Sequence, residues 1–176
     1  MLLRFVLLAV ACGLLFITGC VGQSTTTEIA LNGNSPSGPT VASGPTGPDD
    51  PLQRVAPGPV DENVPTEFQT TASGLRYRIL RASDKRKPIA ANEVVVHYKG
   101  WLDNMRIFDS SYQTGETISF LLQGVIPGWT EGLQLVGEGG MIELEIPSEL
   151  GYGAQGLGPI PPGARLHFLV ELVSIR

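Results

Sequence analysis

The stretch Pro127-Gly-Trp-Thr-Glu-Gly-Leu-Gln-Leu-Val-Gly-Glu-Gly-Gly-Met-Ile-Glu-Leu-Glu-Ile-Pro147 joins a helix pattern to a strand pattern. In its first part, Trp129, Leu133 and Val136 recur at helical spacing, and Pro127 suits the first turn of a helix. In its last part, apolar and polar side chains alternate, which is typical of a strand with one apolar face. The Gly-Glu-Gly-Gly segment between them is not followed by a helix carrying a Lys, so we interpret it as a turn and not as a phosphate-binding loop.

Further strand patterns lie on both sides of this stretch. Runs rich in β-branched and aromatic residues, separated by Gly, Pro and Asn, occupy residues 74–81, 93–102, 117–122 and 164–175. Only residues 128–136 have a helix pattern, so one short helix must cover the apolar face of the sheet. The sequence therefore predicts an α+β fold with an antiparallel sheet and a single helix.

The composition limits the size and the class of function. The chain has 176 residues, 42% of them hydrophobic and 16% charged, which suits one globular domain and an unfolded segment but not two large domains. Its 12 Lys and Arg against 17 Asp and Glu give a net charge of −5, which disfavours nucleic-acid binding. Both cysteines lie near the N-terminus, which excludes a disulfide-stapled fold and leaves no thiol in the domain for a zinc site.

The N-terminal residues have the order of an export signal. One basic residue, Arg4, precedes an apolar run from Phe5 to Ile17, which is short for a bilayer span. The ending Ile17-Thr-Gly-Cys20 resembles a bacterial lipobox, which implies that residues 1–19 are a signal peptide and that Cys20 is the lipidated first residue of the mature chain. The alternatives are an ordinary cleaved signal with a coincidental cysteine and an uncleaved signal anchor.

The lipobox resemblance implies attachment to the cell envelope. Two or three acyl chains on Cys20 bind a membrane far more strongly than one chain does. Val21 stands where an Asp would, in some Gram-negative bacteria, signal retention in the inner membrane. We therefore favour the outer membrane, with the domain facing the periplasm, over a cell membrane with an extracytoplasmic domain.

Residues 20–68 have the composition of a tether. Between Gly33 and Pro65 there are eight Pro and five Gly but few large apolar residues, so the segment cannot bury enough surface to offset its ordering entropy. We expect it to be disordered, with a reach of roughly 35–40 Å as a flexible coil. A role as a ligand for a partner domain is the alternative. The folded domain is then expected over residues 69–176.

Motifs of aromatic and apolar residues fall among the breaks of this domain. They are Val96-His-Tyr98, Phe108-Asp-Ser-Ser111, Val125-Ile-Pro-Gly-Trp129, Leu150-Gly-Tyr-Gly153, Ile160-Pro-Pro-Gly163 and Phe168-Leu-Val-Glu-Leu172. In this order and spacing they resemble the FKBP family of peptidyl-prolyl cis-trans isomerases, over about residues 71–176. The resemblance implies an antiparallel half-barrel sheet wrapped around the short helix, with the active site in a groove between helix and sheet.

The resemblance also implies the site residues. Trp129 would form the floor for the proline ring, the Ile126 N–H and the Tyr152 hydroxyl would hold carbonyls, and Asp109 would shape the pocket beside the Tyr98 hydroxyl. The catalytic set would be Tyr98, Asp109, Ile126, Trp129 and Tyr152, and the substrate-binding set Phe108, Val125, Ile160 and Phe168. Taken singly, each aromatic residue is better explained by core packing, and only their joint pattern favours a binding site.

The implied reaction needs no cofactor and no metal. Rotation about an X–Pro bond breaks no covalent bond, but its barrier is about 18–20 kcal/mol because amide resonance is lost. An apolar pocket favours the twisted amide, in which charge separation is smaller. The implied ligands are proline-containing polypeptides, which we expect here to be exported proteins. We expect the protein itself to be monomeric. The alternative is a non-catalytic chaperone or binding module with the same groove.

Several rim positions depart from the usual family pattern. Ile118 replaces an aromatic residue, Leu157 lies in the region of a loop histidine, and Asn104-Met105 replaces an acidic-Gly turn. The resemblance implies macrolide inhibitors as a second kind of ligand. These departures leave the affinity for macrolides and the preference for the residue before proline open.

Overall fold

The structure, a computed structural model, describes residues 47–176. The expected signal peptide, the lipidation site Cys20 and the first part of the expected tether lie outside the described residues. Within residues 47–176, no helix is long and apolar enough to cross a membrane. The strands are β1 (Gln69–Thr70), β2 (Arg76–Arg81), β3 (Glu93–Leu102), β4 (Ile107–Ser110), β5 (Ile118–Leu121), β6 (Met141–Ile146) and β7 (Leu166–Ile175), and the helix is α1 (Pro127–Leu133). Short 3-10 turns are η1 (Ser111–Gln113), η2 (Leu122–Gly124), η3 (Ser148–Leu150) and η4 (Gly153–Gln155).

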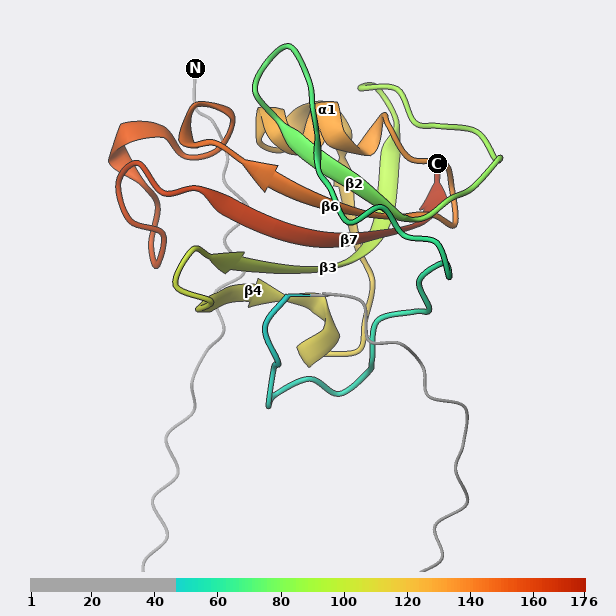
Figure 1. The fold of residues 1–176 in the computed structure, drawn as a ribbon, viewed down its shortest axis with the longest axis horizontal. Coiled ribbons are helices and arrows are strands. Elements are labelled where there is room, and N and C mark those ends of the chain that lie inside the picture. The colour runs from blue at the N-terminus through green and yellow to red at the C-terminus, as the bar shows by residue number, and fades with distance from the viewer. Residues whose placement is uncertain (1–46) are drawn as a thin grey trace, which may run out of the picture. The chain divides into compact units, whose positions relative to one another are not determined.

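The strands form one antiparallel sheet in the order β1-β2-β6-β7-β3-β4 (Figure 1). The long strand β3 has two partners on one side, because β5 pairs with Glu93–Val96 and β4 pairs with residues 99–101. The predicted fold class, an antiparallel open sheet with one short helix, is confirmed. The predicted strands are each found within a few residues. The sequence does not predict β1 and β4, because the two residues of β1 and the four of β4, Ile-Phe-Asp-Ser, are too few to show a strand pattern.

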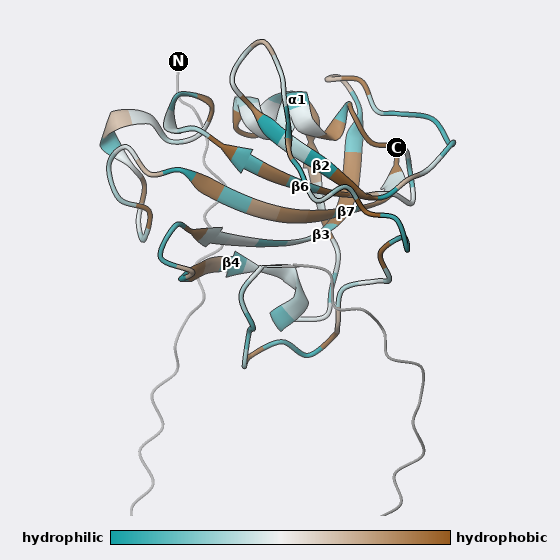
Figure 2. Ribbon diagram, in the orientation of Figure 1, coloured by the Kyte–Doolittle hydropathy of each residue, from teal (hydrophilic) through white to brown (hydrophobic). Residues whose placement is uncertain are grey.

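The helix α1 lies against β6 because two of its residues lack side chains. A Cβ atom added to Gly128 would lie 2.5 Å from Ile146, and one added to Gly132 would lie 2.7 Å from Leu144. These glycines are four residues apart, so they lie on one face of the helix. The buried Trp129 and Leu133 join Leu144, Ile146, Val170 and Leu172 in the main core, and Figure 2 shows the hydrophobic positions along β7.

The opposite face of the sheet is also covered. Leu80, Trp101, Tyr112, Met141 and Leu169 form a second buried cluster there, with Val60 and Val64 packed against it. The expectation of one apolar face is therefore wrong, because apolar residues alternate onto both faces of β2, β6 and β7.

The segment that covers this second face was expected to belong to the tether. The structure instead packs residues 47–68 against the sheet, so the folded unit begins before residue 69. The segment packs against the sheet with few apolar residues of its own, because Val60 and Val64 contact the second buried cluster, which other parts of the chain form. Backbone groups of the segment also find partners, as in the hydrogen bond from the Asp61 N–H to the Leu80 carbonyl (2.8 Å).

Candidate functional site

The entry of α1 fixes the position of Trp129. Ile126 is the N-cap residue in an extended conformation, and Pro127 occupies the first turn, where its missing N–H costs nothing. The Thr130 hydroxyl donates a hydrogen bond to the Leu122 carbonyl (2.7 Å), which ties the helix to the preceding turn. Trp129 is 4% exposed.

Aromatic rings surround Trp129 edge to face. Tyr98 and Phe168 each lie 5.2 Å from it between ring centroids, with interplanar angles of 84° and 82°. Phe120 lies 5.7 Å away at 86°. Phe108 extends the group by an edge contact with Phe168 (5.5 Å). We call Tyr98, Phe108, Phe120, Trp129 and Phe168 the aromatic cluster.

A missing side chain makes room for two of these rings. Gly100 on β3 pairs with Phe168 on β7 and with Asp109 on β4. A Cβ atom at this position would lie 2.7 Å from both the Phe108 ring and the Phe168 ring. Because both contacts are far below van der Waals distance, Gly100 is needed for the observed packing.

Tyr98 and Asp109 form the polar part of the site. The Tyr98 hydroxyl donates a hydrogen bond to Asp109 Oδ2 at 2.5 Å, and Asp109 itself is exposed. Burial, and next the charge of Asp109, raise the pKa of Tyr98 well above its ordinary value. Burial and then Asp109 also raise the pKa of Tyr152. Both hydroxyl groups are protonated at neutral pH, so that of Tyr98 can donate to Asp109 and that of Tyr152 can donate to an incoming acceptor.

The remaining predicted residues lie at the edge of the same core. Val125, Ile126, Phe108 and Tyr152 are half-buried and pack against the core that contains Trp129. Ile160 is 7% exposed and is held by reciprocal backbone hydrogen bonds with Leu157 (3.0 and 2.9 Å).

The loop that carries Tyr152 and Ile160 is also contacted from outside. It contains several glycines with positive φ, among them Gly153, Gly156 and Gly158. The Arg106 guanidinium, from the turn between β3 and β4, donates a hydrogen bond to the Pro159 carbonyl. A hollow of about 220 Å³ lies beside this loop, lined by residues such as Leu102, Pro161 and Arg165.

Two N–H groups of the site have no partner in the part of the chain that the structure describes. The indole Nε1 of Trp129 is buried without a hydrogen bond. The backbone N–H of Ile126 donates to no group within residues 47–176. The latter is half-buried and is available to an incoming acceptor. Residues 47–176 contain no group of three or more side chains able to hold a metal ion.

Sequence reasoning missed Phe120 and Gly100. Phe120 contacts both Trp129 and Tyr98, the latter at 6.1 Å between centroids. The alternation Ile118, Phe120, Leu122 in the predicted strand 117–122 could have placed it on the inner face. No sequence signal identifies the two rings that exclude a side chain at Gly100.

The fold and the aromatic site define the class of protein. The family model for FKBP-type peptidyl-prolyl cis-trans isomerases matches residues 84–173, and the chain belongs to this family. It is similar to FkpA of Escherichia coli (strain K12), with 47% identity over 108 residues that make up 61% of this chain and 40% of FkpA. It is also similar to the FKBP-type 22 kDa isomerase of the same organism, with 43% identity over 118 residues, 66% of this chain and 57% of that protein.

Solved structures give the same result. The crystal structure of FkpA from Escherichia coli matches with a TM-score of 0.62 and 46% identity, covering 64% of this chain and 53% of that chain. The crystal structure of AtFKBP13 matches with a TM-score of 0.58 and 31% identity, covering 62% of this chain and 99% of that chain. The chain thus spans about half or less of the length of FkpA.

Proposed function

We propose that the protein is a peptidyl-prolyl cis-trans isomerase that accelerates rotation about X–Pro bonds in exported polypeptides. The observation that carries the proposal is the buried Trp129, which three aromatic rings hold edge to face at the start of α1. Family membership supports the same activity. A flat indole face fixed in this way suits the apolar prolyl ring of a substrate, which carries no N–H donor.

The proposed mechanism is selective binding of the twisted amide. The prolyl ring rests on Trp129 while the carbonyl of the preceding residue rotates. The free N–H of Ile126 and the hydroxyl of Tyr152 donate hydrogen bonds to substrate carbonyls flanking the bond. Asp109 accepts the Tyr98 hydroxyl hydrogen bond and so fixes that ring at the wall of the site.

The proposed activity has a direct test. The purified chain is added to a Leu-Pro or Phe-Pro peptide, and cis-trans exchange is measured by NMR magnetisation transfer. We expect exchange far faster than the uncatalysed process, which takes tens to hundreds of seconds at 25 °C. If the peptide binds but its exchange rate is unchanged, the protein is a non-catalytic chaperone or binding module and not an enzyme. If the peptide does not bind and its exchange rate is unchanged, both hypotheses are refuted.

We also propose that the chain is attached to the cell envelope through acylated Cys20, as a monomer. The support is the sequence Ile17-Thr-Gly-Cys20 after an apolar run. Residues 21–46 then separate the anchor from the first described residue, Gly47. Mass spectrometry of the N-terminal peptide tests this attachment: we expect an acylated Cys20 as the first residue, and an unmodified Cys20 would refute it. Outer and inner membranes separated on a density gradient then decide between the periplasm-facing outer membrane and the cell membrane.

A further inference from the structure

The part of the site that carries Phe108 and Asp109 is weakly supported by the sheet itself. The strand β4 has four residues, lies at the edge of the sheet and pairs with β3 through only three residue pairs. Its register shifts between Gly100 and Trp101, which marks a bulge. A short edge strand with a bulge has few ladder hydrogen bonds to fix its position.

Residues 47–66, which we call the strap, contact the turn η1 that follows β4. They lie on the face of the sheet that carries the second buried cluster. The backbone N–H groups of Arg54 and Val55 both donate to the carbonyl of Tyr112 in η1, at 2.9 and 3.3 Å. The Gln113 side-chain amide donates to Asp50 Oδ2 at 3.0 Å. Figure 1 shows the strap beside the β4 end of the sheet.

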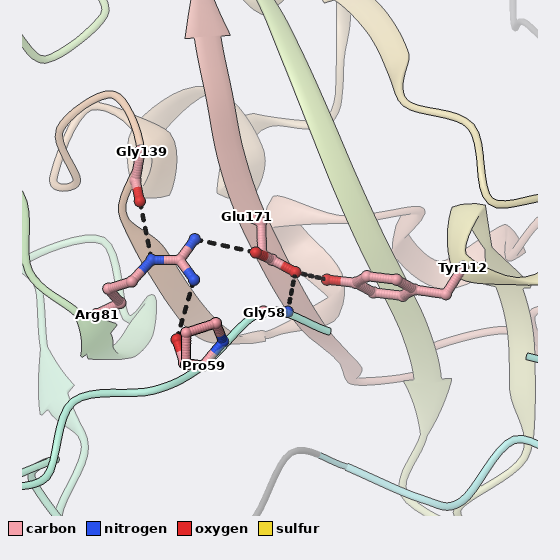
Figure 3. Close-up of polar contacts among 6 residues, drawn as sticks. All are labelled: Gly58, Pro59, Arg81, Tyr112, Gly139 and Glu171. Carbon is pink, nitrogen blue, oxygen red and sulfur yellow. Dashed lines mark hydrogen bonds and ion pairs between the residues drawn. The ribbon is translucent and has the colours of Figure 1, made fainter. Parts of the chain in front are cut away.

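A buried polar network fixes the middle of the strap to β7. Glu171 Oε1 accepts hydrogen bonds from the Gly58 N–H (2.8 Å) and from the Tyr112 hydroxyl (2.7 Å). Arg81 contacts the other oxygen of Glu171 at 2.9 Å and donates to the Pro59 carbonyl at the same distance (Figure 3). Because Tyr112 and the strap share one carboxylate oxygen, displacement of the strap changes the surroundings of Tyr112 directly.

Tyr112 leads from this network to the aromatic cluster. Its ring is 1% exposed and stacks on His97 at 5.2 Å between centroids. The neighbouring Ser111 hydroxyl accepts a hydrogen bond from the Tyr98 N–H at 2.8 Å and lies 3.1 Å from His97 Nδ1. Tyr98 in turn holds Asp109. The strap is thus connected through η1 to both members of the Tyr98–Asp109 pair.

We propose that the strap is a positioning element of the isomerase site. It holds η1 and the end of β4 from the far face of the sheet, and thereby sets the position of Phe108 and Asp109 relative to Tyr98. No strap residue touches the substrate. This inference rests on the proposed isomerase activity only for its effect on rate, because the position of η1 can be measured without substrate.

The test uses the full chain and the substitution Gly58→Ala. An added Cβ would lie 2.6 Å from Glu171 Oε2 and 2.7 Å from Arg81 Nη1, so either the strap or the ends of these two side chains must shift, and both shifts disturb the hydrogen bonds that join the strap to the network. Gly58 has no positive φ, so alanine brings no backbone strain of its own. The matched control is Leu52→Ala, a strap substitution at a side chain that is 68% exposed.

Two readouts separate positioning from general destabilisation. The first is amide hydrogen exchange at Tyr98 and Gly115, whose N–H groups donate to Ser111, compared with exchange at Ile142 in the β2–β6 ladder. The second is kcat/KM on a Leu-Pro peptide, well below the melting temperature. For Gly58→Ala we expect the exchange rates at Tyr98 and Gly115 to rise by a factor about tenfold larger than the factor at Ile142. We expect kcat/KM to fall about three- to tenfold, because one hydrogen bond is lost.

Each other outcome counts against a defined statement. Equal acceleration of exchange at all three amides, or unchanged exchange at Tyr98 and Gly115, would overturn the strap proposal. Faster exchange at Tyr98 and Gly115 with an unchanged kcat/KM would also overturn the strap proposal. An inactive wild-type chain would instead refute the proposed isomerase activity, and the exchange measurement would still test whether the strap positions η1. If Gly58→Ala does not fold, Tyr112→Phe removes the hydroxyl contact alone and is judged by the same readouts.

Discussion

Replacement of Trp129 tests the proposed platform most directly. The ring is 4% exposed and contacts three aromatic neighbours. Trp129→Ala therefore leaves a cavity, and we expect the free energy of unfolding to fall by about 3–5 kcal/mol. The same change removes the surface on which the prolyl ring is proposed to rest, so kcat/KM should fall by more than about a hundredfold.

A second substitution separates the loss of the ring from the loss of its N–H group. Trp129→Phe keeps an aromatic face and deletes the indole N–H, which is buried without a partner. Since an unsatisfied buried donor costs about 1–3 kcal/mol, its removal offsets part of the lost packing. We expect Trp129→Phe to cost less than about 2 kcal/mol and to retain measurable activity.

The assays are urea unfolding followed by fluorescence and circular dichroism, and peptide isomerisation at a temperature where every variant is folded. Leu75→Ala is the control, because Leu75 is fully buried in the same core but belongs to no part of the proposed site. It should lower stability without a comparable loss of kcat/KM. A folded Trp129→Ala variant with near wild-type activity would show that the site lies elsewhere.

Further substitutions test the polar and strained positions. Tyr152→Phe should lower turnover with little change in melting temperature, and unchanged turnover would remove Tyr152 from the site. Met105 has a φ of 64°, so Met105→Gly should raise the free energy of unfolding by about 0.5–1 kcal/mol in urea titrations, and a loss of stability would contradict this reasoning. Burial alone would raise the pKa of Glu171, but hydrogen bonds from Gly58, Tyr112 and Arg81 outweigh it and lower the pKa. The ionised Glu171 carboxylate therefore stabilises the fold above its ordinary pKa of 4.5, and this stabilisation is lost as the pH falls below that value. Glu171→Gln should flatten the pH dependence of the free energy of unfolding below pH 4.5. An unaltered slope would refute this role of Glu171.

The sequence predicted those parts of the fold that depend on local pattern. The alternation in 141–147 and the helical spacing of Trp129 and Leu133 both correspond to elements of the structure, because burial of one face leaves a periodic record. The α-helix ends at Leu133 and not at residue 136. The residues after it form hydrogen bonds over three residues instead of four, as in a 3-10 turn; one example is the bond from the Val136 N–H to the Leu133 carbonyl (3.4 Å).

The parts that depend on distant contacts were not predictable in the same way. The segment 47–66 is rich in Pro and Gly and poor in apolar residues, so its composition indicates disorder. Its order comes from groups far along the chain, such as Glu171, 113 residues from Gly58. The ring contacts of Phe120 likewise depend on the pairing of β5 with β3 and not on its own neighbours in sequence.

The two glycines of α1 also determine how the helix is rotated about its axis. Gly128 and Gly132 face β6, and any side chain there would collide with Ile146 or Leu144. The same rotation places Glu131 beside the turn between β1 and β2, where its carboxylate accepts a hydrogen bond from Ser73 at 2.6 Å. The orientation of the indole face is therefore set by the absence of two side chains, and a single methyl group added beneath the helix can alter ligand binding without ever meeting the ligand.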